Sequence, residues 1–237
     1  MHHLVEDYWY GELGCKRADL VSGKTAVFAH GTLQGYSGVM AFKRGDACIV
    51  SAPAHLVAEL SQALKSVEPA QAFNAEFLQK ILGTRVERVI GPGWLGTISS
   101  ADFLPKPDQD TRLITPADAK LYERFLAECP FKEVEVSSLS PYQSPAVGVF
   151  TGGQIVAAGS YEIFERVVAH IGVLCRPAFR GKGFGVKVVS LITELALKKP
   201  NLGVQYRTLL NNQASVAAAK RVGFKDFAQT IAIRLKF

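Results

Sequence analysis

The pattern of apolar and polar positions predicts a chain that mixes strands and helices throughout. Short apolar runs bounded by glycine or proline are typical of strands, and they occur at 25–31, 46–53, 85–96, 112–115, 146–162, 167–175, 203–210 and 227–235. Apolar residues at helical spacing predict helices at 53–66, 74–83, 116–129 and 211–222, and between the glycine-rich stretch at 181–185 and Pro200. This order of elements predicts an α+β protein.

Two of these patterns also predict how neighbouring elements connect. Residues 146–162 form two strand-like runs around the sequence Thr-Gly-Gly at 151–153, which is a hairpin signal. The run at 167–175 is almost wholly apolar, which is typical of a central strand covered on both faces. Asn212 and Gly223 bracket the last predicted helix, in the positions where these residue types cap a helix start and a helix end.

A domain boundary is predicted at 103–112, "FLPKPDQDTR", where proline and acidic residues replace the apolar pattern. We therefore expect a smaller α/β domain of unknown role over residues 1–108 and a second domain over residues 109–237. The length of 237 residues is ample for a substantial core, whether the chain forms one large domain or two smaller ones.

Several classes of protein are disfavoured by composition. No stretch approaches the ~18 consecutive apolar residues of a membrane span, and the start of the chain has acids where a secretory signal needs basic and apolar residues. We therefore expect a cytoplasmic protein without a membrane partner. The four cysteines, Cys15, Cys48, Cys129 and Cys175, form no CxxC pair. The sequence thus predicts neither a metal site nor a disulfide scaffold.

Positive charge is concentrated near the C-terminus. Residues 170–237 contain 12 Lys and Arg against two acids, Glu194 and Asp226, a net charge of +10, whereas the whole chain carries +6. Such a region fits a small polyanionic ligand. It also fits nucleic acid, although aromatic residues are not interleaved with the bases as single-strand binding favours.

Residues 175–189, "CRPAFRGKGFGVKVV", join a strand to a helix through a basic, glycine-rich loop. Such a junction binds anions, because unpaired N–H groups and the positive end of the helix dipole face the loop. Gly183 follows Lys182 where a Walker loop needs Ser or Thr. No acidic residue occurs between 195 and 225, which argues against a Rossmann dinucleotide site. A different polyanion is therefore expected.

The loop and the sequence after it resemble the GNAT superfamily of acyl-CoA-dependent N-acyltransferases. The residues that carry the resemblance are Pro177, Arg180, Gly183 and Gly185 in the first motif, and Asn212, Ser215 and Gly223-Phe224 in the second. The similarity covers about 112–237. The first part of the chain is similar to the leader domain of uncharacterised bacterial two-domain GNAT proteins. The resemblance implies a GNAT-type C-terminal fold, with a central, mainly antiparallel mixed sheet flanked by helices.

The resemblance also implies the residues that hold acetyl-CoA as co-substrate, without a metal. The loop amides from Arg180 to Val186 would hold the CoA diphosphate, and the strand that precedes the loop would pair with the pantetheine arm. The implied set is Val173, Leu174, Cys175, Arg180, Gly181, Lys182, Gly183, Phe184, Gly185, Val186, Asn212 and Ser215. Gly172, inside an apolar strand, predicts a bulge or a close backbone approach.

Acetyl transfer requires a neutral amine, whereas a free alkylamine has a pKa of about 10.4. A general base or a water chain is therefore expected, and the candidates are Glu162 and His170, with Glu165 beside them. The family often places a Tyr on the last helix to protonate the leaving thiolate, and Ala219 stands at that position here. Tyr206, water, or departure of the unprotonated thiolate would have to substitute.

The leading hypothesis is an N-acetyltransferase that moves an acetyl group from acetyl-CoA to a primary amine of a small molecule or peptide, by direct attack through a tetrahedral intermediate. A catalytically weak acyl-CoA-binding regulatory module is the alternative, motivated by Ala219 and by the lack of an assured base. Nucleic-acid binding through the basic C-terminal region is a third and less favoured hypothesis. The acceptor, the acyl length and the role of the first domain stay open, as does a homodimer.

Overall fold

The protein is described by a computed structural model over residues 2–33, 35–137, 139–140 and 145–236. The chain divides into two compact units that interleave along the sequence. Unit 1 contains Gly96–Arg207 and Asn212–Lys225 with the first residues of the chain, and unit 2 contains Glu6–Leu95, Thr208–Asn211 and Asp226–Phe237. That residues 1–108 and 109–237 are separate domains stays a prediction, because these units follow spatial contacts and are not continuous in sequence.

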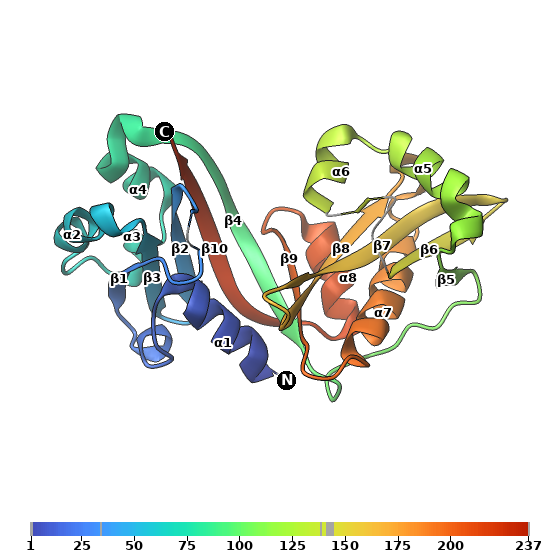
Figure 1. The fold of residues 1–237 in the computed structure, drawn as a ribbon, viewed down its shortest axis with the longest axis horizontal. Helices are drawn as coiled ribbons and strands as arrows, with labels where there is room; N and C mark the ends of the chain where they lie inside the picture. The colour runs from blue at the N-terminus through green and yellow to red at the C-terminus, as the bar shows by residue number, and fades with distance from the viewer. Residues whose placement is uncertain (1, 34, 138, 141–144, 237) are drawn as a thin grey trace. The chain divides into compact units, whose positions relative to one another are not determined.

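Unit 2 holds most of the N-terminal elements and the last strand (Figure 1). Its elements are α1 (His2–Leu13), η1 (Asp19–Val21), β1 (Thr25–Ala29), β2 (Gly38–Arg44), β3 (Ala47–Ala52), α2 (Ala54–Ala63), α3 (Pro69–Ala72), α4 (Ala75–Leu82), η2 (Gly83–Arg85), β4 (Val86–Ile98) and β10 (Lys225–Leu235). The strand order is β1-β3-β2-β10-β4. The pair β1–β3 is parallel, and β2 is antiparallel to both β3 and β10.

One face of the unit 2 sheet is covered by helices because α2 presents an apolar stripe. Leu56, Leu60 and Leu64 are buried in one cluster with residues of β2, β3, α4 and β10. The spacing of four residues between these leucines places them on one side of the helix. Residues from β10 complete this core, so the last strand of the chain folds with the N-terminal elements.

Unit 1 contains the glycine-rich loop. Its elements are β5 (Thr111–Leu113), η3 (Pro116–Asp118), α5 (Ala119–Ala127), α6 (Phe131–Ser137), β6 (Ala146–Thr151), β7 (Gln154–Phe164), β8 (Val168–Cys175), η4 (Pro177–Phe179), α7 (Phe184–Leu197), β9 (Gly203–Leu209) and α8 (Gln213–Val222). The strand order is β9-β8-β7-β6-β5. Neighbours in β5–β8 are antiparallel, whereas β8–β9 is parallel. The predicted α+β class, with a mixed sheet flanked by helices, is confirmed.

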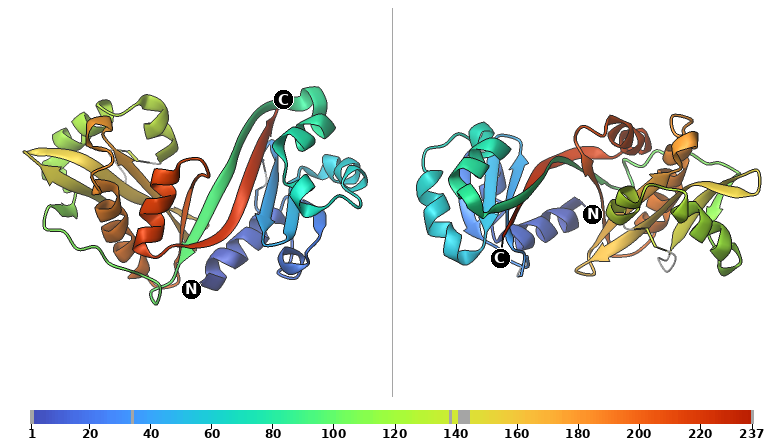
Figure 2. Two further views of the ribbon diagram at one scale, coloured as in Figure 1. Left: turned by 180° about the vertical axis from the view of Figure 1, so that it is seen from behind. Right: turned by 90° about the horizontal axis from the view of Figure 1, so that it is seen from above.

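Helices cover both faces of this sheet, as Figures 1 and 2 show. On one face, α7 packs so closely on β7 that a Cβ at Gly159 would lie 2.5 Å from Val188 Cγ1. On the other face, Tyr122 and Phe125 of α5 are buried against Leu174 of β8. Side chains alternate along a strand, so β8 presents Val173 and Cys175 toward the α7 face and Leu174 toward α5.

The predicted connections of unit 1 are confirmed. The turn between β6 and β7 has φ of +57° at Gly152 and +72° at Gly153, as a two-residue hairpin turn requires. The Asn212 side chain accepts a hydrogen bond from the Ser215 N–H at the start of α8, and Gly223 ends the helix at φ +109°. The apolar pattern did not predict α1, α3, β2 or α6.

The segment at 103–112, predicted as a linker, packs against α7 and α8. The Leu104 N–H donates to the Val222 carbonyl oxygen at 2.8 Å, and the Lys106 N–H donates to Ser190 Oγ at 2.7 Å. Lys187 Nζ lies 2.5 Å from Asp108 Oδ1. Partial burial acts to raise the pKa of Asp108, but the hydrogen bonds from Lys187 and Thr111 together outweigh it and lower the pKa. The segment therefore contacts α7 and the C-terminal end of α8, the two helices that begin in the candidate motifs.

Candidate functional site

The glycine-rich loop has a backbone that only glycine adopts without strain. The short helix η4 ends at Phe179, Arg180 is extended, and α7 begins at Phe184. Between them, Gly181 has φ of +74° and Gly183 has φ of +83°. A Cβ at either position would meet nothing within 4 Å. The two glycines are therefore required by conformation rather than by space, and they leave the loop open on its outer side.

Several N–H groups of the loop have no hydrogen-bond acceptor. Val186 N–H donates to the Gly183 carbonyl oxygen at 3.1 Å, and Arg180 N–H donates to Pro177 at 3.3 Å. Within the part of the chain that the structure describes, the N–H groups of Gly181 to Gly185 donate no hydrogen bond. They lie at the N-terminus of a helix of 14 residues, where the dipole favours an anion. The N–H groups without an acceptor therefore run from Gly181 to Gly185. The resemblance implied a longer set of amides for the diphosphate, from Arg180 to Val186.

Residues 180–187 contain three cations, Arg180, Lys182 and Lys187, and two of them have acidic partners. Arg180 Nη2 lies 2.5 Å from Glu133 Oε2, and Arg180 Nε donates to the Cys175 carbonyl oxygen at 3.2 Å. Lys187 is paired with Asp108. Lys182 is exposed, with its ammonium 5.2 Å from the centre of the Phe179 ring. Arg180 thereby ties the loop to α6 and β8, while the charge of Lys182 is available to a ligand.

The strand before the loop has an unpaired edge. Strands β8 and β9 pair only from Val168–Gly203 to Ile171–Tyr206, whereas β8 continues to pair with β7 as far as Cys175. Among the described residues, the β9-facing edge of Val173, Leu174 and Cys175 therefore meets no strand. An unpaired strand edge can pair with an extended chain of amides. This edge ends at Cys175, where the chain continues through η4 into the glycine-rich loop.

Cys175 lies at the junction of this edge with the loop. Its Sγ would be 3.5 Å from a Cβ at Gly185, in the first turn of α7. Burial raises the pKa of the Cys175 thiol to about 11. The thiol is therefore protonated near neutral pH and is a poor nucleophile. This disfavours an acyl-cysteine intermediate and fits direct attack by an amine.

Gly172 was expected to mark either a bulge or a close backbone approach, and the structure shows the close approach. The register of β7–β8 runs without a shift from Cys175 through Gly172, so there is no bulge. Instead, a Cβ at Gly172 would lie 1.9 Å from the Ser137 carbonyl oxygen at the end of α6. Only glycine lets the end of α6 approach β8 this closely, directly beside the unpaired edge.

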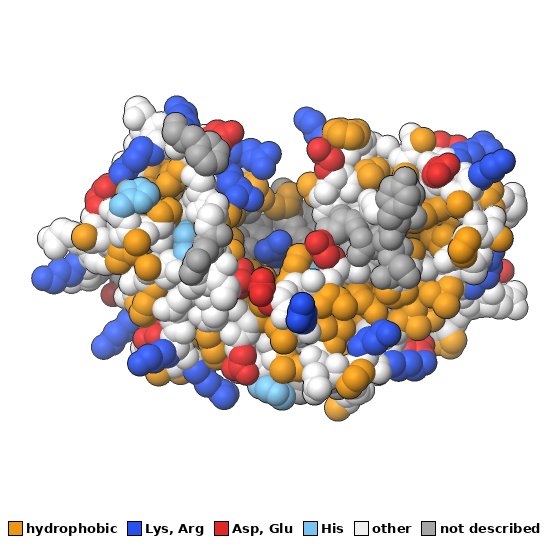
Figure 3. Space-filling model, in the orientation of Figure 1, with side chains coloured by type: hydrophobic (Ala, Val, Ile, Leu, Met, Phe, Trp, Pro, Cys, Tyr) orange, Lys and Arg blue, Asp and Glu red, His pale blue; other side chains and the backbone are white. Residues whose placement is uncertain are grey.

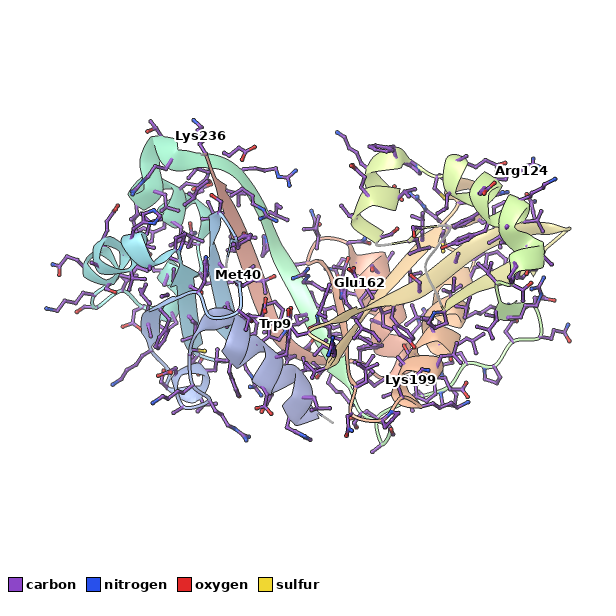
Figure 4. The ribbon with its side chains drawn as sticks, in the orientation of Figure 1. Trp9, Met40, Arg124, Glu162, Lys199 and Lys236 are labelled. Carbon is purple, nitrogen blue, oxygen red and sulfur yellow. The ribbon has the colours of Figure 1, made fainter. Side chains whose placement is uncertain are left out.

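Glu162 and His170, the candidates for the base, are brought together by the sheet. They are direct partners in the β7–β8 register, which puts both side chains on the same face, with Cβ atoms about 5 Å apart. Glu162 is exposed near the end of β7 (Figure 4). The His170 ring stacks on Phe164 at 5.6 Å, and its Nδ1 has no hydrogen-bond partner among the described residues.

The environment of His170 makes it a weak base. Burial lowers its pKa to about 3, and the nearby Arg207 acts in the same direction. His170 is therefore neutral across the physiological range and can give or accept a hydrogen bond. This low proton affinity disfavours His170 itself as the group that takes a proton from an amine.

The second motif brings an unexpected pair together. Tyr206 Oη of β9 lies 2.9 Å from Ser215 Oγ of α8. Ala219, at the position where the resemblance implies a tyrosine, is fully buried. The sequence named Tyr206 and Ser215 separately, but nothing in its spacing indicates their contact. The Arg180–Glu133 and Lys187–Asp108 pairs were missed for the same reason, because their partners are far apart in the chain.

The described residues contain no group of three or more His, Cys, Asp or Glu side chains that could hold a metal ion. None of the described helices is long and apolar enough to cross a membrane.

Comparison with known proteins agrees with this geometry. Residues 114–224 match the model of the acetyltransferase (GNAT) family. None of the curated proteins matches the chain. An acetyltransferase from the GNAT family of Colwellia psychrerythraea is similar in fold, with 17% identity and a TM-score of 0.50 over 67% of this chain. The match spans 61% of the Colwellia protein, less than two thirds of its length.

A second solved structure is similar along the whole chain. It is the GCN5-related N-acetyltransferase-like protein from Streptococcus suis 89/1591, with 15% identity, a TM-score of 0.51 and full coverage of both chains. At this identity the likeness concerns the fold, and it supports the predicted GNAT-type arrangement of sheet and helices. The family match covers both candidate motifs. The chain therefore carries an acetyltransferase domain of the GNAT family at residues 114–224.

Proposed function

We propose that this protein is an acetyl-CoA-dependent N-acetyltransferase that acetylates a primary amine. One observation carries the proposal: the unpaired N–H groups of Gly181 to Gly185 lie at the start of α7, directly after the unpaired edge of β8. The first feature suits a diphosphate and the second suits the amides of a pantetheine arm. The family match at 114–224 supports the same assignment.

The residues present fit acetyl-CoA as co-substrate. The N–H groups of Gly181 to Gly185 would hold the diphosphate, and the exposed Lys182 would add a positive charge beside it. The main chain of Val173, Leu174 and Cys175 would pair with the arm. A donor on this strand edge would also stabilise the oxyanion that forms when an amine attacks the thioester carbon.

The amine reaches its reactive form by losing a proton to this chain. We assign that role to the Glu162 carboxylate, which is exposed and in register with His170. His170, held neutral by burial, would orient the amine through a hydrogen bond. The resulting neutral amine can attack the carbonyl carbon directly, and no covalent enzyme intermediate is needed.

The substitution Gly183→Glu tests the binding assignment. A glutamate at Gly183 would place a negative charge in the loop and would strain a residue at φ +83°, so we expect CoA binding to be abolished while the fold persists. Isothermal titration of CoA measures this loss, and circular dichroism checks the fold.

Gly152→Glu provides the matched control. Gly152 also has a positive φ, +57°, and a Cβ there would meet nothing within 4 Å, but it lies in the turn between β6 and β7. This variant should bind CoA as the wild type does. CoA affinity retained by Gly183→Glu would contradict the loop assignment.

Turnover separates the proposal from its alternatives. Release of CoA from acetyl-CoA, stimulated by members of an amine panel, supports the enzyme. Tight CoA binding without amine-dependent turnover would point to the regulatory module. Salt-dependent DNA affinity that CoA does not compete away would point to nucleic acid. On the face that Figure 3 shows, Lys and Arg side chains are interspersed with Asp and Glu rather than gathered in a stripe.

A further inference from the structure

A pair of hydroxyl groups lies where β8 and β9 separate. Tyr206 pairs with Ile171, and this is the last pair of the two strands before the unpaired edge of β8 begins. The Tyr206 hydroxyl is 2.9 Å from Ser215 Oγ, so one hydroxyl donates to the other. Ser215 is in the first turn of α8, where its N–H donates to the Asn212 side chain at 3.2 Å. The Asn212 cap thus fixes the backbone of Ser215 at the helix start, and the Tyr206 hydroxyl is the partner of its Oγ.

The two hydroxyls differ in access to solvent. Tyr206 is 4% exposed, and its ring meets the Phe224 ring edge-on at 5.6 Å. Ser215 is partly exposed. A ligand atom between the separating strands would therefore meet Ser215 Oγ first, with the Tyr206 hydroxyl behind it.

Tyr206 keeps its proton under all ordinary conditions. Burial raises its pKa to about 12, the hydrogen bond with Ser215 lowers it in part, and the Cys175 thiol raises it. The influence of Cys175 also indicates that the Tyr206 hydroxyl is close to the strand assigned to the pantetheine arm. Tyr206 is thus a protonated hydroxyl group close to β8, the strand assigned to the pantetheine arm.

The chemistry of acyl transfer creates a need for a proton at this place. If the loop holds the diphosphate and the arm runs back along β8 from Cys175 toward Gly172, the thioester sulfur reaches the point where β8 and β9 part. When the C–S bond breaks, its electron pair goes to sulfur. A thiol has a pKa of about 8.5, so a donor makes sulfur a better leaving group. Ala219 carries no group that could serve.

We propose that Ser215 and Tyr206 together donate the proton that the departing CoA sulfur takes up, an inference that rests on the proposed acetyltransferase function. The Ser215 proton moves to sulfur as the C–S bond breaks, and the Tyr206 proton moves to Ser215 Oγ. The resulting Tyr206 phenolate regains a proton from solvent. No oxidant, metal or further reactant is required.

Kinetic experiments test the donor role. Tyr206→Phe and Ser215→Ala should each lower kcat with acetyl-CoA on the order of 100-fold, the lower end of what general acid catalysis contributes, with little change in KM for acetyl-CoA. The double variant should be no slower than either single variant, because the two hydroxyls act in one chain. Tyr122→Phe is the control, since its buried hydroxyl has no partner among the described residues.

A better leaving group distinguishes proton donation from a structural role. With an acetyl selenoester of the CoA selenium analogue, the leaving selenol is more acidic than a thiol and needs less protonation. The kcat defect of Tyr206→Phe and Ser215→Ala should then shrink toward wild type. If the kcat defect is equal with acetyl-CoA and with the acetyl selenoester, the inference is overturned while the acetyltransferase function stays in place.

A binding experiment tests the inference independently of turnover. Calorimetry at pH 9, where CoA is largely the thiolate, compares CoA with desulfo-CoA. Ser215→Ala should weaken CoA binding about tenfold or more, as loss of a hydrogen bond to a charged group does, and should leave desulfo-CoA unchanged. Equal losses for both ligands would overturn the inference. Wild-type protein that binds neither ligand would instead overturn the proposed function.

Discussion

At the scale of single residues, the site depends on positions where a side chain is absent. Gly181 and Gly183 are needed for their positive φ in an open loop, whereas Gly172 is needed because the Ser137 carbonyl oxygen occupies the place of a Cβ. The demand at Gly181 and Gly183 is conformational, whereas the demand at Gly172 is steric. These glycines should therefore respond differently to substitution by alanine.

Gly172→Ala should destabilise unit 1. The added Cβ would lie 1.9 Å from a backbone oxygen, which cannot rotate away as a side chain can, so we expect a loss of about 3 kcal/mol in the free energy of unfolding. Urea unfolding measures it. Gly11→Ala is the control, because its Cβ would meet only Thr32 Oγ1 at 3.9 Å within helix α1 and alanine favours a helix. Equal stability of Gly172→Ala and wild type would contradict the predicted clash.

At the scale of elements, β8 connects the proposed catalytic and binding groups. One end carries His170 in register with Glu162, the middle carries Gly172, and the far end leads through Cys175 into the loop. The turn between β7 and β8 sets this register. It places two residues other than glycine at positive φ, Glu165 at +47° and Arg166 at +60°.

Replacing that turn should stabilise the protein. Val167 N–H donates to the Phe164 carbonyl oxygen at 3.0 Å, so Glu165 and Arg166 are the central residues of a two-residue hairpin turn, for which Asn-Gly is preferred. We expect the double substitution Glu165→Asn and Arg166→Gly to add about 1–2 kcal/mol to the free energy of unfolding, because positive φ is costly for other residues.

Thermal unfolding measures this gain, with Gly45→Ala as a control that should lower stability. Gly45 has φ of +55° in the turn between β2 and β3, and a Cβ there would meet nothing within 4 Å. An unchanged or lower melting temperature for the Asn-Gly variant would show that the β7–β8 turn is not strained.

At the scale of the whole molecule, the buried neutral His170 links stability to pH. Its pKa is about 3 in the folded protein and about 6.5 in an unfolded chain, so the unfolded state binds the proton more tightly between these values. The stability associated with neutral His170 is fully present above pH 6.5. It is lost progressively as pH falls from about 6.5 toward 3.

His170→Gln should therefore flatten the pH dependence of stability. Glutamine does not titrate, so the free energy of unfolding of this variant should fall less steeply than that of the wild type between pH 6.5 and 4. Urea unfolding at several pH values gives both curves. Parallel curves for the two proteins would mean that His170 does not titrate on unfolding. Arg207 also acts to lower the pKa of His170, and an arginine keeps its charge across this pH range.

Much of the fold and part of the site could be predicted from the sequence, because local patterns encode them. The hairpin around residues 151–153, the Asn212 and Gly223 caps and the loop-to-helix junction depend on neighbouring residues only. Helix α6 was missed because it has seven residues and no apolar stripe, and Phe131 and Val136 on it are exposed. Strand β2 was missed because glycines at 31, 35, 38 and 45 made the whole stretch between the neighbouring strands look like a turn.

The sequence by itself determined the class of fold and the position of the glycine-rich loop, since glycine spacing, caps and apolar periodicity are local properties of the chain, and its two motifs carried the resemblance to the GNAT family. Tertiary structure alone decided which distant side chains meet. It paired Tyr206 with Ser215, tied Arg180 to Glu133, brought Ser137 against Gly172 and folded β10 with the N-terminal elements. Contacts of this kind depend on strand register and on helix packing across the sheet, and spacing along the chain carries no record of either.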